Sequence, residues 1–129
     1  MKKALVIGSL NMDLVTRVNV TPKVGETVSG RGLLTNPGGK GANQAVALGK
    51  LGVDVKMIGC LGNDEYGSQL KDNLKEMNVD DGTFTVDDSP TGVAFIMVND
   101  SSDNSIVVID GANGKLTPEM VNREWFEGI

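Results

Sequence analysis

A glycine-rich stretch at residues 37–44, with the sequence PGGKGANQ, constrains this chain more than any other feature. Pro37 opposes a helix before it, small or apolar residues recur at positions 42, 45, 46 and 49, and Gly52 suits a helix end. We therefore expect a helix that begins within the stretch. Glycine inside a helix costs roughly 1 kcal/mol relative to alanine, so three glycines at one helix entrance predict positions where a side chain does not fit.

The start of this helix also carries chemistry. Amides of a first helical turn are unpaired and partly positive, which suits the oxygen atoms of a polar ligand. Lys40 adds a full charge, and Asn43 adds a donor and an acceptor one turn later. The alternative is a tight strand-to-helix turn with a solvated lysine. The stretch is not a Walker A loop, because that motif requires glycine at the position of Leu34 and Ser or Thr at the position of Gly41.

Composition limits the function classes. A chain of 129 residues, 40% hydrophobic and 22% charged, fits about one ordinary globular domain. A net charge of -5 argues against nucleic acid or an anionic membrane as partner, and no apolar stretch is long enough for a signal peptide or a membrane span. The single cysteine, Cys60, excludes an internal disulfide and fits a reducing, cytoplasmic location. Without histidine, any general base is a carboxylate, a lysine or a group outside this chain.

The N-terminal residues predict a strand followed by a site. Ala4 to Ile7 is a short apolar run closed by Gly8, which is typical of a buried parallel strand. Ligands of open α/β sheets collect beyond the carboxyl ends of strands, so Asn11 and Asp13 lie where a site is expected. Alternation would place both on one side of an extended chain. The alternative is a turn in which each side chain bonds its own backbone.

The region between this strand and the glycine-rich helix has β character. Two pieces rich in Val and Thr, Thr16 to Val20 and Glu26 to Gly30, flank a turn at residues 21–25. Neither resembles a crossover helix. We therefore expect a small antiparallel flap that projects from the main sheet.

Strand and helix patterns alternate again after the glycine-rich helix. A strand is expected within Val53 to Cys60 and a helix from about Glu65 to Met77, capped by Asn63 or Asp64. Its apolar stripe is typical of a covering helix, to which we assign no chemistry. A further short strand is expected at Thr83 to Val86 within a loop.

Two strands near the C-terminus are apolar at every position. Val93 to Val98 and Ile106 to Ile109 flank the polar segment 99–105, which predicts a hairpin with both faces buried. In a flap, one face would cover a ligand and the other would meet a second subunit. The alternative is that both are central strands of the main sheet, and spacing does not separate the two.

The last residues predict the start of another helix. Thr117 suits the N-cap position and Pro118 the first helical position. A doubly wound sheet that ended here would leave an apolar edge and face uncovered. We therefore expect this chain to be the front part of a larger domain.

Four blocks, GSLNMD, NPGGKGANQAVALGKLG, TGVAFIMVN and IDGANG, resemble the N-terminal part of the ribokinases in the PfkB-type carbohydrate kinase family. They cover essentially the whole chain in family order. The resemblance implies an α/β fold: the N-terminal part of a Rossmann-like ribokinase fold, with a mainly parallel sheet, flanking helices and a small β lid. Residues 1–129 would then be the N-terminal part of a single domain, with lid strands near 15–34 and 92–110.

The resemblance also implies residue roles. The polar and glycine positions carried over as sugar-binding are Asn11, Asp13, Gly39, Lys40 and Asn43. Two positions, Ala94 and Val108, are carried over as apolar lid contacts. Family members that act on other sugars usually replace the lysine, so Lys40 favours ribose.

The implied reaction transfers the γ-phosphoryl group of ATP to the 5-hydroxyl of D-ribose, with Mg²⁺ and a monovalent cation, K⁺, as cofactors. The lid would pair with that of a second subunit in a homodimer. The catalytic aspartate of the family, in a GAGD-type motif, and its metal-binding positions have no counterpart here. We therefore expect no catalytic or metal-binding residue in this chain, and no activity from it alone. The alternatives are a non-catalytic sugar-binding or dimerising module, and a kinase for another sugar or a nucleoside.

Overall fold

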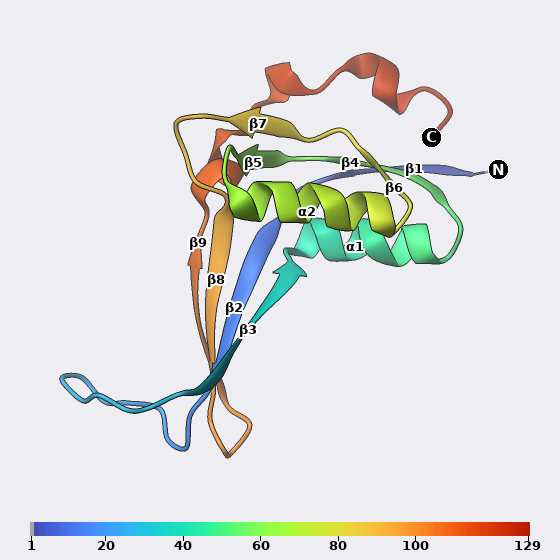
Figure 1. Cartoon of the computed structure of the whole chain (residues 1–129). Helices are drawn as coiled ribbons and strands as arrows, with labels where there is room; N and C mark the ends of the chain where they lie inside the picture. Colours follow the sequence, from blue (N-terminus) through green and yellow to red (C-terminus); the bar gives the residue numbers. More distant parts are fainter. Residues whose placement is uncertain (1) are drawn as a thin grey trace.

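A computed structural model describes residues 2–129 of the chain as two β-sheet regions with two helices between them (Figure 1). The first region holds a parallel three-stranded sheet in the order β1-β4-β6 and a parallel pair, β5 and β7. The second is a four-stranded sheet in the order β3-β2-β8-β9. The bounds are β1 Lys3–Ile7, β4 Asp54–Ile58, β5 Cys60–Gly62, β6 Val79–Asp81 and β7 Phe84–Val86, with β2 Asn11–Arg17, β3 Arg31–Gly38, β8 Gly92–Val98 and β9 Asn104–Ile109.

The two helices form where the sequence predicts them. Helix α1 spans Lys40–Lys50 and helix α2 spans Glu65–Glu76, and both lie on the same face of the β1-β4-β6 sheet (Figure 1). Gly52, with φ of 82°, follows the end of α1, and Asp64 caps α2. The core between helices and sheet is apolar and buried, with Leu10, Met12, Ala42, Ala45, Val55, Met57, Leu61, Leu70, Leu74 and Val79. The predicted α/β fold with flanking helices is confirmed.

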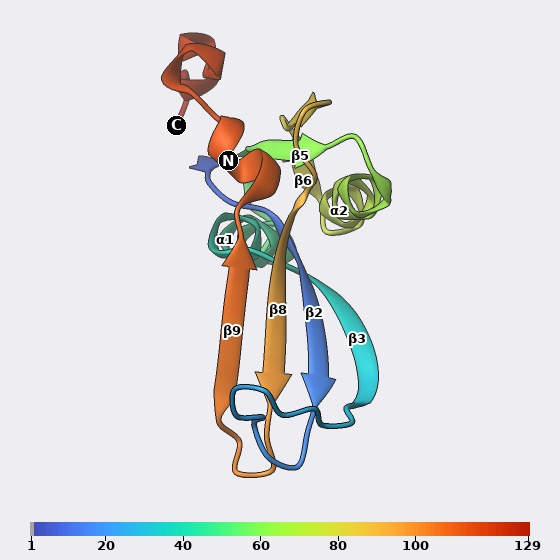
Figure 2. The same cartoon turned by 90° about the vertical axis from the view of Figure 1, so that its left-hand side faces the viewer.

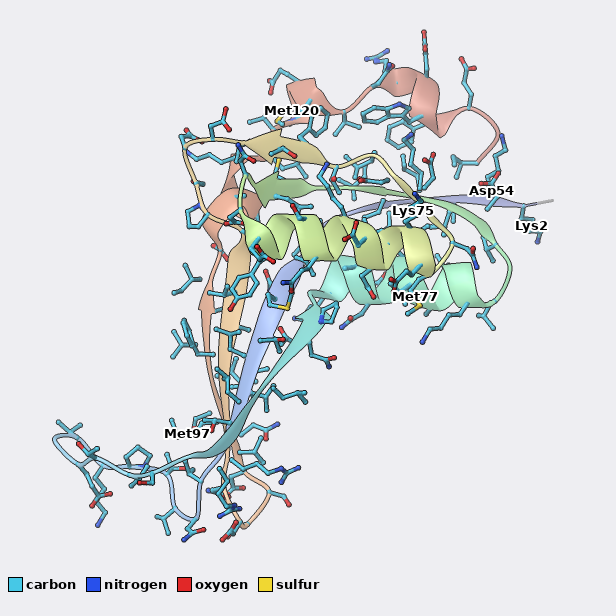
Figure 3. All side chains as sticks on the ribbon, in the orientation of Figure 1. Lys2, Asp54, Lys75, Met77, Met97 and Met120 are labelled. Carbon is cyan, nitrogen blue, oxygen red and sulfur yellow. The ribbon has the colours of Figure 1, made fainter. Side chains whose placement is uncertain are left out.

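The four-stranded sheet, which we call the projecting sheet (β3-β2-β8-β9), stands away from the helices (Figure 2). Strands β2 and β8 run parallel, and the hairpin partners β3 and β9 run antiparallel to them. The predicted projection from the main sheet is confirmed, but the sheet is not purely antiparallel as predicted, because β2 and β8 pair in parallel. The alternative that β8 and β9 are central strands of the parallel sheet is excluded. Figure 3 shows Met97 near the far end of this sheet, well away from the helices.

Several local predictions are wrong. No strand forms at Glu26 to Gly30, because the partner of β2 begins only at Arg31. The hairpin of β8 and β9 is not buried on both faces: every residue of β9 is exposed, since this edge strand has no helix against it within residues 2–129. Strand β1 is likewise only half-buried, because it lies at the edge of its sheet.

The C-terminal region forms three short 3-10 turns rather than a helix. Their bounds are η1 Gly111–Lys115, η2 Pro118–Met120 and η3 Arg123–Phe126. Thr117 precedes η2 with Pro118 at the first position, as predicted, but its side chain makes no capping hydrogen bond. The turns η2 and η3 lie on the face of the parallel strands opposite to the helices (Figure 1).

Candidate functional site

One cavity of about 510 Å³ lies where the projecting sheet meets the start of α1. Its wall includes all seven residues that the sequence analysis selected: Asn11, Asp13, Gly39, Lys40, Asn43, Ala94 and Val108. Asn11 and Asp13 belong to β2, so they alternate onto the same side of an extended strand and not into a turn. Asp13 pairs with Ala94, and Ala94 with Val108, across three neighbouring strands. The structure therefore brings three distant segments to one concave surface.

Glycines at the helix entrance allow this close approach. Gly39 has φ of 97°, and a Cβ atom there would lie 2.7 Å from the Ser9 carbonyl oxygen and 2.9 Å from the Leu10 Cα. A Cβ atom on Gly38 would lie 2.6 Å from the carboxyl carbon of Asp13. Neither position has room for a side chain, as the sequence predicted. A larger residue at Gly39 would collide with the backbone of Ser9 and Leu10, and one at Gly38 would displace the Asp13 side chain.

The first turn of α1 is only partly available to a ligand. The amide of Ala42 donates to the Ser9 carbonyl oxygen at 3.0 Å, so the loop after β1 already satisfies it. The helix has no side-chain cap, since its N-cap residue is Gly39. The expectation that the whole first turn offers free amides is therefore too broad, and the side chains of Lys40 and Asn43 line the cavity at this end of the helix.

The carboxylate of Asp13 lies in an unusual environment. Burial raises its pKa above the ordinary value, and no hydrogen bond or charge within residues 2–129 offsets that effect. Asp13 is thus a half-buried acceptor that accepts no hydrogen bond from the protein within residues 2–129. Such a group gains more than an exposed carboxylate when a ligand hydroxyl donates to it.

Asn11 is buried, with 9% of its surface exposed, and its neighbour is Asn113 of η1. The Asn113 side-chain nitrogen donates to the Asn11 side-chain oxygen at 2.8 Å. Asn113 therefore contacts the site residue that starts β2, although the two lie 102 positions apart in the sequence.

Five residues of the cavity wall were not selected from the sequence: Ser9, Ile96, Ile106, Asp110 and Asn113. Ile96 and Ile106 pair with each other on the wall that carries Ala94 and Val108. Asp110 and Asn113 follow the carboxyl end of β9. Both residues belong to the IDGANG block, to whose residues the sequence analysis assigned no role in binding. Its position after a strand was the signal that could have drawn attention to them.

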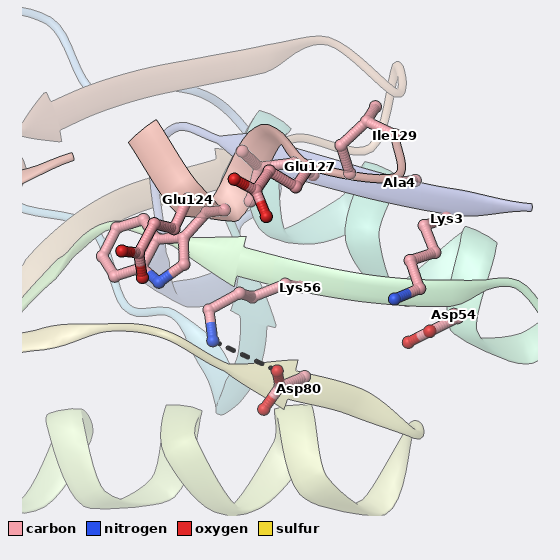
Figure 4. Close-up of a pocket in the computed structure, with 10 residues that line it drawn as sticks. Lys3, Ala4, Asp54, Lys56, Asp80, Glu124, Glu127 and Ile129 are labelled. Atoms are coloured by element: carbon pink, nitrogen blue, oxygen red, sulfur yellow. Dashed lines mark hydrogen bonds and ion pairs between the residues drawn. The ribbon is translucent and has the colours of Figure 1, made fainter. Parts of the chain in front are cut away.

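A second hollow, of about 250 Å³, lies between η3 and the parallel strands (Figure 4). It contains none of the selected residues. Its charged groups are partly paired: Lys56 and Asp80 form an ion pair of 3.2 Å, and the Lys56 ammonium lies 5.5 Å from the Trp125 ring. Exposed pairs of this kind contribute little to stability, and we assign no ligand to this hollow.

Within residues 2–129 there is no group of three or more His, Cys, Asp or Glu side chains arranged to hold a metal ion. None of the helices described there is long and apolar enough to cross a membrane.

Comparison with known proteins shows the family to which the chain belongs. The profile of the pfkB family of carbohydrate kinases matches residues 1–128, so the chain belongs to this family. The ribokinase of Bacillus subtilis (strain 168) is 48% identical over 119 residues, which cover 92% of this chain and 40% of that protein. The chain thus spans well under half the length of this curated relative.

Solved structures show the same fold. The ribokinase of Thermotoga maritima matches with a TM-score of 0.90 and 35% identity, over 99% of this chain and 42% of that one. The Arabidopsis thaliana ribokinase, solved in complex with ribose and ATP, matches with a TM-score of 0.79 and 36% identity, over 88% of this chain and 38% of that one. The fold is therefore the ribokinase fold.

Proposed function

We propose that this chain supplies the sugar-binding half of a ribokinase, which transfers the γ-phosphoryl group of ATP to the 5-hydroxyl of D-ribose. The observation that carries the proposal is the single cavity that collects Asn11, Asp13, Lys40 and Asn43 from two separate segments of the chain. The similarity to ribokinases from bacteria and a plant supports the same substrate class.

The polar side chains suit a polyhydroxylated ligand. Asp13 is an acceptor, Lys40 is a donor, and Asn43 offers both functions, whereas the side-chain oxygen of Asn11 already accepts from Asn113. A sugar hydroxyl donates one hydrogen bond and accepts others, so a neighbouring carboxylate and amide hold it in one orientation. Phosphoryl transfer depends mainly on positioning and charge stabilisation, and this chain contributes the positioning of the acceptor sugar.

We propose that the projecting sheet acts as a lid over the sugar. Its inner wall is apolar at Ala94, Ile96, Ile106 and Val108. Such a wall keeps water away from the reacting sugar hydroxyl. Water would otherwise compete with this hydroxyl as the phosphoryl acceptor. Ala94 is buried, whereas Val108 is 54% exposed, so Val108 is the residue with most surface left for a ligand to cover.

ATP, Mg²⁺ and K⁺ are the proposed cofactors, by similarity to the family. Residues 2–129 hold no group of His, Cys, Asp or Glu side chains arranged to bind a metal ion. When bound, ATP and Mg²⁺ would supply the phosphoryl group and neutralise its charge. We expect the 129-residue chain by itself to transfer no phosphoryl group. Ribose-dependent formation of ADP by the purified chain, in a coupled assay, would contradict this.

We also propose a homodimer formed through the outer face of the projecting sheet. An apolar hollow of about 330 Å³ lies there, with Leu14, Leu33, Phe95, Met97 and Val107 in its wall. Leu33, Phe95 and Val107 are 71%, 47% and 62% exposed, respectively, which is a large apolar surface to leave in water. Sedimentation should show a dimer that Val107→Lys converts to a monomer.

Titration calorimetry with D-ribose, fructose and adenosine tests the proposed substrate. Heat with ribose alone would support a ribokinase, and preference for fructose or adenosine would favour the alternative of a kinase for another sugar or a nucleoside. The remaining alternative, a sugar-binding or dimerising module without catalysis, predicts binding of ribose without ADP formation by the protein as its gene encodes it. No heat with any of the three would overturn the sugar site.

A further inference from the structure

The turn η1 brings the side chain of Asn113 to the start of β2. Its oxygen accepts a hydrogen bond from the Leu10 amide at 3.0 Å, and its nitrogen donates to the Leu10 carbonyl oxygen at 3.1 Å. A backbone amide only donates and a backbone carbonyl only accepts, so these two bonds admit a single orientation of the Asn113 amide. The second proton of the Asn113 nitrogen then goes to the side-chain oxygen of Asn11, at 2.8 Å.

This arrangement dictates the orientation of Asn11 in turn. Its oxygen faces the Asn113 nitrogen, so its own nitrogen lies at the opposite end of the amide group. Asn11 is buried except for 9% of its surface, and it forms part of the cavity wall next to Asp13 on the same side of β2. The end of Asn11 that remains for a ligand is therefore its NH₂ group.

The surrounding backbone holds Asn113 in place. A Cβ atom on Gly92, the residue paired with Asn11 in β8, would lie 2.5 Å from the Asn11 oxygen and would collide with the Asn113 nitrogen. Ala112 is fully buried, and its amide donates to the Pro90 carbonyl oxygen at 2.7 Å. The absence of a side chain at Gly92 thus leaves room for the contact between the two asparagines, and the hydrogen bond from Ala112 to Pro90 holds η1 against the loop before β8.

We propose that Asn113 is a positioning residue, which turns the side-chain amide of Asn11 so that a hydrogen-bond donor lies beside the Asp13 acceptor in the cavity. The sugar part of this inference depends on the function proposed above. One hydroxyl group then accepts from Asn11 and donates to Asp13, a pairing that an amide turned the other way would break, since it would set two acceptors side by side. Asn113 acts through Asn11 and carries out no chemistry of its own.

The first test uses the ligand-free protein and does not depend on sugar binding. Proton exchange of the side-chain NH₂ groups is followed by nuclear magnetic resonance. Both protons of the Asn113 nitrogen are bonded to protein acceptors, so they should exchange roughly tenfold more slowly than those of Asn11. The reverse order of exchange would overturn the assigned orientation.

The second test measures D-ribose affinity by calorimetry, with the protein as its gene encodes it. Asn113→Ala should weaken binding roughly tenfold, through loss of the fixed donor at Asn11. In an Asn11→Ala background the same substitution should have no further effect, because its target is gone. A merely structural role would give losses that add in the double variant, and that result would overturn the proposal.

Two further variants complete this experiment. Asn122→Ala is the matched control, since Asn122 bonds the Glu124 amide in a similar turn away from the cavity, and it should leave ribose affinity unchanged. Asn113→Asp keeps an acceptor for the Leu10 amide but replaces the donor by a charged acceptor oxygen, which should draw the Asn11 nitrogen toward position 113 and weaken ribose binding. It tests the same point if Asn113→Ala does not fold. Unchanged affinity in Asn113→Asp would overturn the proposal. Absence of ribose binding by the unmodified protein would overturn the proposed function, and the exchange measurement would still decide the orientation of Asn11.

Discussion

Two aspartates of this chain lie in opposite surroundings. Asp64, at the start of α2, accepts hydrogen bonds from the Gly67 amide at 2.9 Å and from the amide and hydroxyl of Thr91 at 2.9 and 2.6 Å. Asp13, in the cavity wall, has burial as the only influence on its pKa. The first carboxylate thus accepts three hydrogen bonds from protein donors, and the second accepts none within the described residues.

The pKa values follow from these surroundings. Burial by itself raises the pKa of Asp64, but its three hydrogen bonds together outweigh burial and hold the pKa below the ordinary value. Burial raises the pKa of Asp13, and nothing opposes it. Asp64 therefore stabilises the junction of α2 with β8, whereas Asp13 is held at some cost to stability and is available to a ligand. Carboxylates whose pKa is shifted by burial, without a protein hydrogen-bond partner, are typical of binding sites.

Loss of the Asp13 carboxylate should have the largest effect, and on binding alone. Asp13→Ala should weaken D-ribose affinity roughly tenfold to a hundredfold, because hydrogen bonds to a charged group contribute about 1.5 to 3 kcal/mol. The unfolding free energy should stay constant or rise, since a poorly solvated charge is removed. Calorimetry and chemical denaturation measure the two quantities. Unchanged D-ribose affinity together with a lower unfolding free energy would show that Asp13 stabilises the fold and does not bind the sugar.

Loss of the Asp64 carboxylate should affect stability instead. Asp64→Ala removes the cap of α2 and leaves the amide of Thr91, which is only 2% exposed, without an acceptor. We expect a loss of about 2 kcal/mol in unfolding free energy, a moderate value because Asp64 itself is partly screened by solvent. Asp64→Asn is the matched control, because asparagine also caps helices, and it should lose less. Equal losses in both variants would argue against the capping role.

A fall in pH should affect Asp13 and Asp64 differently. The raised pKa of Asp13 means that ribose affinity falls as pH drops toward that pKa, beginning above the ordinary value of 3.8. The contribution of Asp13 to the unfolding free energy changes with pH in the other direction from ribose affinity. This contribution is present below the pKa of Asp13 in the unfolded chain, and it is lost as pH rises through the pKa in the folded protein. The contribution of Asp64 is present above 3.8 and is lost as pH falls through its lowered pKa. Calorimetry across a pH series, with Asp13→Asn as reference, would contradict this if both proteins lost affinity together.

The smallest effect is the coupling between the two aspartates. They share no hydrogen-bond partner, so the stability changes of Asp13→Ala and Asp64→Ala should add in the double variant to within about 0.5 kcal/mol. Denaturation of the four proteins of this cycle provides the measurement. A larger coupling would mean that the cavity and the junction of α2 with β8 form one unit.

The sequence predicted what depends on local backbone preference. The glycines and Pro37 predicted the start of α1, and the cap at Asp64 and the apolar stripe predicted α2. Uninterrupted apolar runs predicted the hairpin of β8 and β9. These elements can be predicted because periodicity, caps and turn residues act within a few positions of the chain. The cavity wall also contains residues, such as Ala94 and Val108, whose roles only the resemblance to the ribokinases implies.

Only the tertiary structure decided which distant residues meet. The start of β3 at Arg31, and not at Glu26, depends on its register with β2, and the exposure of β9 depends on which elements cover that sheet. Asn113 meets Leu10 across 103 positions, a contact that no local pattern encodes. Strand register and the approach of remote turns are set by packing of the whole chain, so the sequence determined the elements and the site motifs, and the fold alone determined how the site residues are oriented.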